Sequence, residues 1–180
     1  SIKKAEIQSL EAIEQAQAAQ IANIEASYRV SFTMNGGTGL VYSGEQFLWP
    51  CPSSSNISSY YGPRVAPTAG ATSYHRGIDI PADDGTEIEA AESGTVIESE
   101  YNDSRGWYIL LDHGNDIYTR YQHMNSKSPI NVGEVVTKGQ VIGYVGCTGS
   151  CTGPHVHYEV WKGQKWNHIN PSALYPGGYR

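Results

Sequence analysis

The sequence lacks a long apolar segment, an excess of basic residues and any motif of a serine or cysteine nucleophile. No apolar run approaches the roughly 18 residues of a membrane-spanning helix, so no such helix is expected. Twelve Lys and Arg face eighteen Asp and Glu, and the net charge of −6 argues against binding to nucleic acid. Without a Gly-x-Ser-x-Gly motif or a Cys–His pairing, no covalent intermediate is expected.

Phenylalanine is scarce, with two residues, whereas glycine and tyrosine are common, with 20 and 13. This composition suits a β domain with many turns. Short runs of β-forming residues bounded by turn signals predict strands at 86–90, 94–99, 107–111, 117–121, 135–136, 140–145 and 155–161. We therefore expect a mainly β domain at 49–180, with a largely antiparallel sheet and an open groove.

The first 28 residues contain neither Gly nor Pro, and apolar residues recur at the spacing of a coiled coil. Glu14 and Gln17 interrupt this seam. The pattern predicts an N-terminal α-helix at 1–32, either the end of a coiled coil or a solvent-exposed helix, followed by a Gly-rich linker at 33–48. We expect this segment to restrain the groove or to bind a regulatory protein. The chain begins at Ser1 and shows no signal peptide, which favours a mature or truncated piece of a secreted protein.

Two short motifs carry residues that bind metals. His75 and Asp79 are four apart, and His155 and His157 are two apart. In an extended strand, side chains at i, i+2 and i+4 point to the same face. Two imidazoles and a carboxylate from two strands form a three-ligand zinc site with a fourth position open for water, as in catalytic zinc sites. These motifs predict a zinc hydrolase.

Each motif also has a simpler interpretation. His75 and Asp79 have the spacing of an exposed pair on a helix, although Gly77, the β-branched Ile78 and the nearby Pro81 argue against a helix there. Alternating histidines also occur on the wet face of a strand. The turn-rich stretch at 146–154 leads directly into the second motif, which favours histidines at the mouth of a groove.

A third histidine completes the set of groups that amide hydrolysis requires. His123 lies at the end of a strand-like run, and histidine is the usual proton carrier near neutral pH. Taken alone, His123 would be interpreted as a structural residue. We interpret His113 as structural and His168 as incidental.

The motifs together resemble the lysostaphin/LytM group of zinc endopeptidases, which cut peptides of bacterial cell-wall peptidoglycan. The resemblance covers residues 49–176, and its motifs occur in the family's order. They are Ile57 to Arg64, His75-x-x-x-Asp79, Leu111 to Asn115, Tyr121-x-His123-Met124, Gly139-Gln140-x-Ile142-Gly143, Thr152 to Glu159 with His155-x-His157, and Asn170-Pro171.

The resemblance implies a role for each residue. His75, Asp79 and His157 would bind one Zn²⁺ per chain, and His155 and His123 would be the catalytic pair. Because two histidines at i and i+2 can both bind one zinc, the residues alone leave the roles of His155 and His157 open. The resemblance also implies the family's β fold, an extracellular or cell-wall location and peptidoglycan peptides as the substrate.

The expected activity is hydrolysis of a peptide bond by water whose pKa the zinc lowers from about 15.7 toward ~7. The bond itself is not encoded in any readable pattern. The alternative is a LytM-like module without hydrolytic activity that activates a cell-wall amidase or serves in an envelope assembly.

The three cysteines allow more than one pairing. Cys147 and Cys151 are four apart in the loop before the second motif, and a disulfide between them is the favoured interpretation in an oxidising compartment. Cys51 would then be a free thiol, in a turn that its flanking prolines predict to be exposed. Other pairings among the three cysteines stay open.

Overall fold

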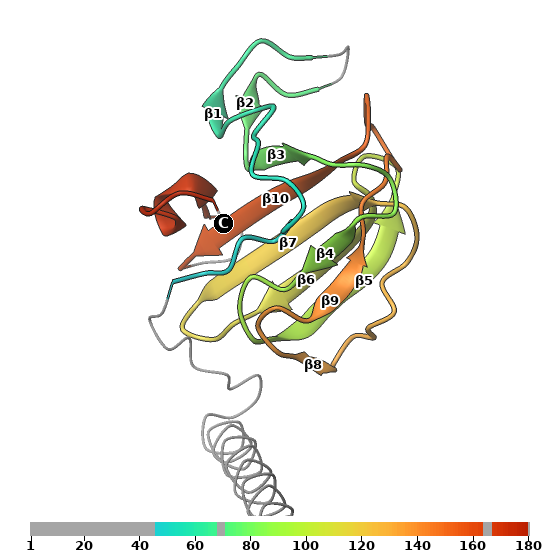
Figure 1. Ribbon diagram of the computed structural model, residues 1–180, viewed down its shortest axis with the longest axis vertical. Helices are drawn as coiled ribbons and strands as arrows, with labels where there is room; N and C mark the ends of the chain where they lie inside the picture. Colours follow the sequence, from blue (N-terminus) through green and yellow to red (C-terminus); the bar gives the residue numbers. More distant parts are fainter. Residues whose placement is uncertain (1–45, 68–70, 164–166, 180) are drawn as a thin grey trace, which may run out of the picture. The chain divides into compact units, whose positions relative to one another are not determined.

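The computed structural model describes residues 46–67, 71–163 and 167–179 (Figure 1). The helix predicted at 1–32 lies outside these residues, as does most of the linker predicted at 33–48. Of the linker's last residues, Phe47 is buried, and the backbone N–H of Leu48 donates to Ala91 O at 2.8 Å. The end of the predicted linker therefore packs against the domain.

In the described part of the chain, nearly all regular structure is β. The elements in chain order are β1 (Gly62–Pro63), β2 (Tyr74–His75), β3 (Ile78–Pro81), β4 (Glu87–Glu89), β5 (Gly94–Asn102), β6 (Gly106–Asp112), β7 (Ile117–Met124), β8 (Val135–Val136), β9 (Val141–Tyr144), β10 (His155–Lys162), β11 (His168–Ile169) and the 3₁₀ helix η1 (Pro171–Leu174). The pairs between these strands are antiparallel. The predicted mainly β fold is confirmed, and the seven predicted strands correspond to β4 to β10.

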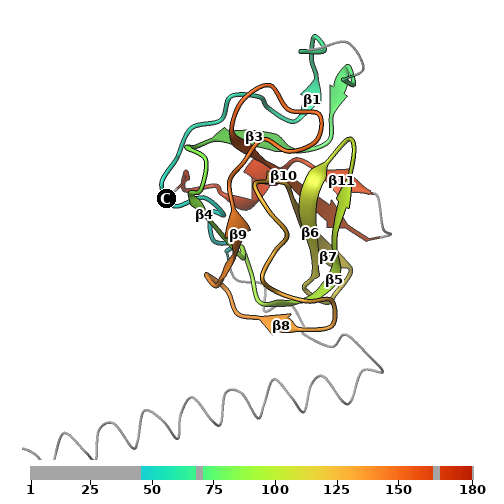
Figure 2. The same ribbon diagram turned by 90° about the vertical axis from the view of Figure 1, so that its right-hand side faces the viewer.

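One sheet carries most of the strands, in the order β11-β10-β7-β6-β5-β8, with β3 also paired to β10. Figure 1 shows β10 between β3 and β7. The strands β4 and β9, which are distant in sequence, form a separate two-stranded sheet, as do β1 and β2. Figure 2 shows β4 and β9 in a layer beside β5, β6 and β7. Fully buried residues from both sheets fill the core, among them Ile88, Ile109, Leu111, Tyr121, Ile142 and Val156.

In the first six residues of β10, side chains alternate strictly between the core and the opposite face of the sheet. Val156, Tyr158 and Val160 are completely buried in the core. His155, His157 and Glu159 point to the opposite face, because side chains alternate along a strand. The period-2 prediction for the two histidines is therefore confirmed.

The cysteine predictions have mixed outcomes. A disulfide joins Cys147 to Cys151, as favoured from the sequence. Cys51 is free, but the prediction of an exposed turn is wrong, since its side chain is completely buried beside Trp49 in the core cluster. The flanking prolines mark a turn of the backbone, and the small apolar thiol points inward from it. Burial raises the pKa of this thiol above its usual value, which keeps it in the unreactive neutral form.

No helix among the described residues combines the length and the apolar character required to cross a membrane.

Candidate metal centre and catalytic groove

Three side chains from β2, β3 and β10 converge on one point. The Nε2 atom of His75 lies 3.1 Å from Asp79 Oδ1 and 3.0 Å from His157 Nδ1. Asp79 Oδ1 lies 2.8 Å from His157 Nδ1. The structure thus brings together the three predicted metal ligands in one cluster.

The cluster fits a zinc ion by donor type and by spacing. Ligand atoms about 2.0–2.1 Å from a tetrahedral zinc are roughly 3.3 Å apart, close to the separations between these three atoms. The second nitrogen of each histidine already has a hydrogen-bond acceptor. His75 Nδ1 donates to Tyr60 O at 2.9 Å, and His157 Nε2 donates to Glu159 Oε1 at 3.0 Å. Burial would lower the pKa of His157, but its hydrogen bonds to Asp79 and Glu159 raise it to about 9. A metal ion at the shared point would therefore displace the proton that His157 Nδ1 donates to Asp79.

The carboxylate of Asp79 is held in a similar way. While Oδ1 faces the histidines, Oδ2 lies 3.3 Å from Arg64 Nη1. Burial alone would raise the pKa of Asp79, but its hydrogen bonds to His157 and His75 outweigh burial and lower the pKa far below its usual value. The carboxylate is thus ionised, which is the form that binds a cation.

The backbone around His75 and Asp79 differs from the prediction of a single extended strand. The chain bends at Arg76 and Gly77, so His75 ends β2 and Asp79 lies in the separate strand β3. A Cβ atom at position 77 would lie only 2.3 Å from Tyr158 O. Glycine lets the bend pass directly against β10, and this close approach brings His75 within reach of His157.

His155 lies beside the three-ligand cluster without joining it. Its Nδ1 donates to Gly153 O at 2.7 Å, so Nε2 carries the free lone pair. That Nε2 lies 3.6 Å from Asp79 Oδ1, which places it at the edge of the metal position. Burial lowers the pKa of His155, despite the opposing effect of Asp79, and favours the neutral imidazole.

His123 reaches the same place through an irregularity in β7. Between β6 and β7 the register shifts, so that Gln122 and His123 together face the single residue Tyr108. This two-against-one pairing is a β-bulge, and His123 has the left-handed backbone angle φ of 63°. Strict alternation would put His123 on the core face with Tyr121. The bulge turns it to the groove face, next to Gln122.

The two predicted catalytic histidines therefore form a pair. The centroids of the His123 and His155 rings are 4.8 Å apart. His123 Nδ1 donates to Thr148 O at 2.8 Å, which again leaves Nε2 unprotonated. Burial lowers the pKa of His123 to about 4, with only a partial offset from Thr148. Both imidazoles are neutral at pH 7 and able to accept a proton.

A buried cluster around Glu159 supports His157, and the sequence reasoning did not identify it. Besides His157, the Glu159 carboxylate accepts from Arg120 Nη2 at 2.5 Å, from Gln122 Nε2 at 3.0 Å and from His168 Nε2 at 3.2 Å. Burial would raise the pKa of Glu159, but these partners lower it far below its usual value. The i+2 spacing of Glu159 from His157 was a usable signal for this contact.

The other histidines have structural settings. His113 is completely buried, with Nδ1 2.9 Å from Ser93 O and Nε2 2.7 Å from Thr119 Oγ1, which confirms the structural interpretation. His168, taken as incidental, instead contacts Glu159 from β11. Its neighbours in sequence gave no sign of this, because the contact depends on the pairing of β11 with β10.

Two hollows of the surface adjoin the candidate metal position. One hollow of about 350 Å³ is bordered by the ligands, His123 and His155 and by Arg76 and Arg105. A second hollow of about 470 Å³ is bordered by Ser58, Val65 and Pro154. Asp79 and His155 border both hollows, so both hollows adjoin the candidate site.

Residues 73–171 match the model of Peptidase family M23. The chain belongs to this family. The resemblance to lysostaphin and LytM-type peptidases is thereby confirmed. Peptidases of this family depend on zinc. The matched region contains the five residues predicted for the site.

Similar proteins agree with this assignment. The peptidoglycan DD-endopeptidase ShyC of Vibrio cholerae serotype O1 is 43% identical over 104 residues, which are 57% of this chain and 24% of that protein. The catalytic domain of the antimicrobial peptidase lysostaphin from Staphylococcus simulans is similar in structure, with a TM-score of 0.60 and 28% identity over 67% of this chain and 91% of that one. A chain in the structure of the SpoIIQ-SpoIIIAH pore forming complex has a TM-score of 0.62 and 28% identity over 73% of this chain and 92% of that one.

The chain covers only about a quarter of the length of the curated relatives it matches, 24% for ShyC and 26% for ShyA of the same organism.

Proposed function

We propose that this chain is a zinc metalloendopeptidase that hydrolyses peptide bonds in bacterial cell-wall peptidoglycan. The observation that carries the proposal is the convergence of His75, Asp79 and His157, with His123 and His155 beside them. Hydrolysis of an amide bond at a zinc site requires three protein ligands, an open coordination position and a neutral base. We place the protein outside the cytoplasm, at the cell wall, because its substrate lies there.

When bound, zinc supplies a Lewis acid that polarises the scissile carbonyl and acidifies water. The protein supplies the proton carriers. His155 Nε2 accepts a proton from the attacking water, since it is unprotonated and faces the metal position. His123 Nε2 borders the same space, and once protonated either ring donates to the charged carbonyl oxygen or to the leaving nitrogen. Thr148 O and Gly153 O hold the two rings in the tautomer this requires.

The groove suits an extended peptide. Because Asp79 and His155 border both hollows, a chain lying along the groove would place residues on either side of the bond to be cut. The names of ShyC, a peptidoglycan DD-endopeptidase, and of lysostaphin, an antimicrobial peptidase, support a cell-wall peptide as this substrate. The bond is left to experiment, since glycyl bridges, D-amino-acid cross-links and stem-peptide bonds are all extended peptides.

The test is digestion of purified peptidoglycan by the zinc-loaded chain. Walls with direct cross-links and walls with glycine bridges are incubated separately, and products are identified by mass spectrometry. We expect new amino and carboxyl termini at one type of bond, and none with His155→Ala. Intact peptides from both walls, with zinc bound and the groove accessible, would contradict the proposal.

The N-terminal segment adds a proposal about regulation that rests on sequence alone. Restraint of the groove by residues 1–45, relieved when a regulatory protein binds them, predicts faster hydrolysis by a chain that begins at Gln46. That start keeps Phe47, which is part of the buried core. Equal rates of the two chains would end this idea.

A second candidate function is a part in an envelope assembly without turnover. It is favoured by the similarity to a chain in the SpoIIQ-SpoIIIAH pore forming complex. The same digestion separates the two functions. Zinc-bearing protein that cuts neither wall, in both the full chain and the chain starting at Gln46, would favour the assembly role or the activation of a separate amidase.

A further inference from the structure

The loop between β9 and β10 holds both catalytic histidines by their rings. Thr148 O accepts the Nδ1 proton of His123 at 2.8 Å, and Gly153 O accepts that of His155 at 2.7 Å. These two carbonyls lie five residues apart in one loop, although the histidines come from β7 and β10. The loop therefore sets the direction and the tautomer of both rings.

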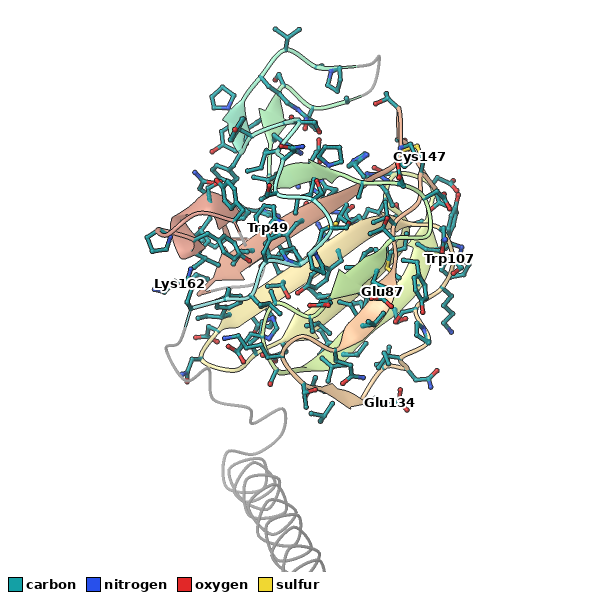
Figure 3. All side chains as sticks on the ribbon, viewed as in Figure 1. Trp49, Glu87, Trp107, Glu134, Cys147 and Lys162 are labelled. Carbon is teal, nitrogen blue, oxygen red and sulfur yellow. A yellow bond between two sulfur atoms is a disulfide. The ribbon has the colours of Figure 1, made fainter. Side chains whose placement is uncertain are left out.

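A disulfide closes this loop at the point where it meets His123. Cys147 and Cys151 have Cα atoms 5.3 Å apart, and Thr148 lies inside the ring they form (Figure 3 labels Cys147). Gly153 lies two residues beyond it. Both cysteines are half-buried, so a small reductant has access to the bond. The covalent ring restricts the rotation of the Thr148 peptide, whose carbonyl is the acceptor for His123.

The ring is also fitted to the sheet. Thr148 Oγ1 accepts from the Trp107 N–H at 2.9 Å and donates to Met124 O at 2.6 Å. A Cβ atom at Gly149 would lie 2.2 Å from Gly106 N, so the loop passes directly over the turn between β5 and β6. These contacts attach the loop to the bulged segment that carries His123.

We infer that the Cys147–Cys151 disulfide, acting through Thr148, is a positioning element for the catalytic histidine pair, so that opening it lowers turnover while zinc stays bound. His123 is affected more than His155, because its acceptor lies inside the ring. The activity measurement rests on the proposed function, whereas the measurement of the His123 tautomer is independent of it.

The experiment compares oxidised and reduced zinc-loaded protein in a Cys51→Ala background, which leaves the two loop sulfurs as the chain's only cysteines. Tris(2-carboxyethyl)phosphine reduces the bond. The S–S bond breaks, the phosphorus is oxidised to a phosphine oxide with oxygen from water, and the two protons of that water form the two thiols. Mass spectrometry after thiol alkylation verifies the reduction.

Three quantities are then measured: zinc per chain, the ¹⁵N shifts of the His123 and His155 rings, and kcat with KM on a cleaved peptidoglycan peptide. We expect one zinc per chain in both forms and a loss of the pure Nδ1–H tautomer at His123 on reduction. We expect kcat to fall roughly 10- to 100-fold, as for a misplaced catalytic group, with a smaller change in KM. The double variant Cys147→Ser with Cys151→Ser should have the kcat and ring shifts of the reduced protein, and the reductant should not change them.

A purely structural disulfide gives a different result. Reduction would then lower the unfolding temperature while the His123 ring shifts and kcat stayed constant, and that result would overturn the inference. Thr148→Val and Thr148→Ser test the same chain of contacts without altering the disulfide. Valine should reproduce the kcat loss and serine should restore activity. A fall with both would point to the methyl group instead and count against the inference.

Failure of the proposed function is distinguishable from failure of this inference. If the oxidised protein cleaves no peptidoglycan, the function is wrong, and the ring shifts alone decide whether the disulfide holds His123. A tautomer change on reduction supports the inference in that case, and unchanged shifts contradict it.

Discussion

Strands β10 and β7 deliver their histidines to the same groove in opposite ways. In β10, regular alternation places His155 and His157 on the groove face and Val156 in the core. In β7, alternation would bury His123, and a β-bulge with a left-handed residue reverses its direction. Strand regularity thus brings the two histidines of β10 to the candidate site, whereas a local departure from regularity brings His123 there. Substitutions in the two strands are therefore expected to have different effects on zinc binding and on hydrolysis rate.

The largest effect is expected from the regular strand. His157→Ala removes a ligand from the three-atom cluster and, with it, zinc and the polarisation that zinc supplies. A loss of several kcal/mol of transition-state stabilisation corresponds to about 10³- to 10⁴-fold in hydrolysis rate. Product release from peptidoglycan measures it, with His113→Gln as the control for a histidine outside the groove. Retention of more than a tenth of the rate would contradict a ligand role.

The bulged strand should lose rate without losing metal. His123→Ala removes a proton carrier, which costs roughly 10²-fold or more in kcat, while the cluster of His75, Asp79 and His157 stays intact. Steady-state kinetics beside zinc analysis of the same sample tests this. Loss of zinc in parallel with the rate would mean that His123 belongs to the metal centre.

A buried histidine outside the groove separates pH effects on stability from those on catalysis. Burial lowers the pKa of His113 to about 4, against about 6.5 in an unfolded chain. The unfolded state therefore binds the extra proton first. The stability due to this group is complete above pH 6.5, and about 3 kcal/mol is lost as the pH falls toward 4. Urea unfolding of the zinc-free protein should show a weaker pH slope in His113→Gln, and identical slopes would refute this.

The hydrogen bond from His157 to Glu159 predicts an intermediate effect of Glu159 on zinc affinity. Glu159→Gln removes the charge that holds His157 and leaves buried Arg120 without its carboxylate. Such a change typically weakens metal affinity 10- to 100-fold. Competition with a chelator measures the affinity, and Glu100→Gln, which lies outside the site, serves as the matched control. Equal zinc affinities of the two variants would remove Glu159 from the metal centre.

The smallest expected effect is the stability difference between glycine and alanine variants, which should have opposite signs at positions 123 and 155. At position 123 the left-handed backbone disfavours any residue with a Cβ atom, so His123→Gly should be more stable than His123→Ala by about 1 kcal/mol. At position 155 the backbone is ordinary strand, and His155→Ala should be more stable than His155→Gly by about 0.5–1 kcal/mol. Denaturant unfolding of the four variants provides both differences. The same sign at both positions would mean that the bulge carries no strain.

The contrast between the strands also explains what the sequence could reveal. Alternation and turn signals predicted β4 to β10 and the shared face of His155 and His157, because those features depend on neighbouring residues. The bend at Gly77 and the bulge at His123 depend on contacts with β10, β6 and Thr148, which are distant in sequence. The resemblance to a family assigned His123 its role, and no local pattern could have shown how it reaches the groove.

The central claim is that adjacent histidines on one face of β10 divide the work, with His157 as a metal ligand and His155 as a proton carrier. Zinc content of purified His155→Ala and His157→Ala, measured side by side by mass spectrometry of the metal, tests it most directly. The account predicts one zinc per chain in His155→Ala and little in His157→Ala. Loss of zinc from His155→Ala, or its retention in His157→Ala, would contradict the assignment.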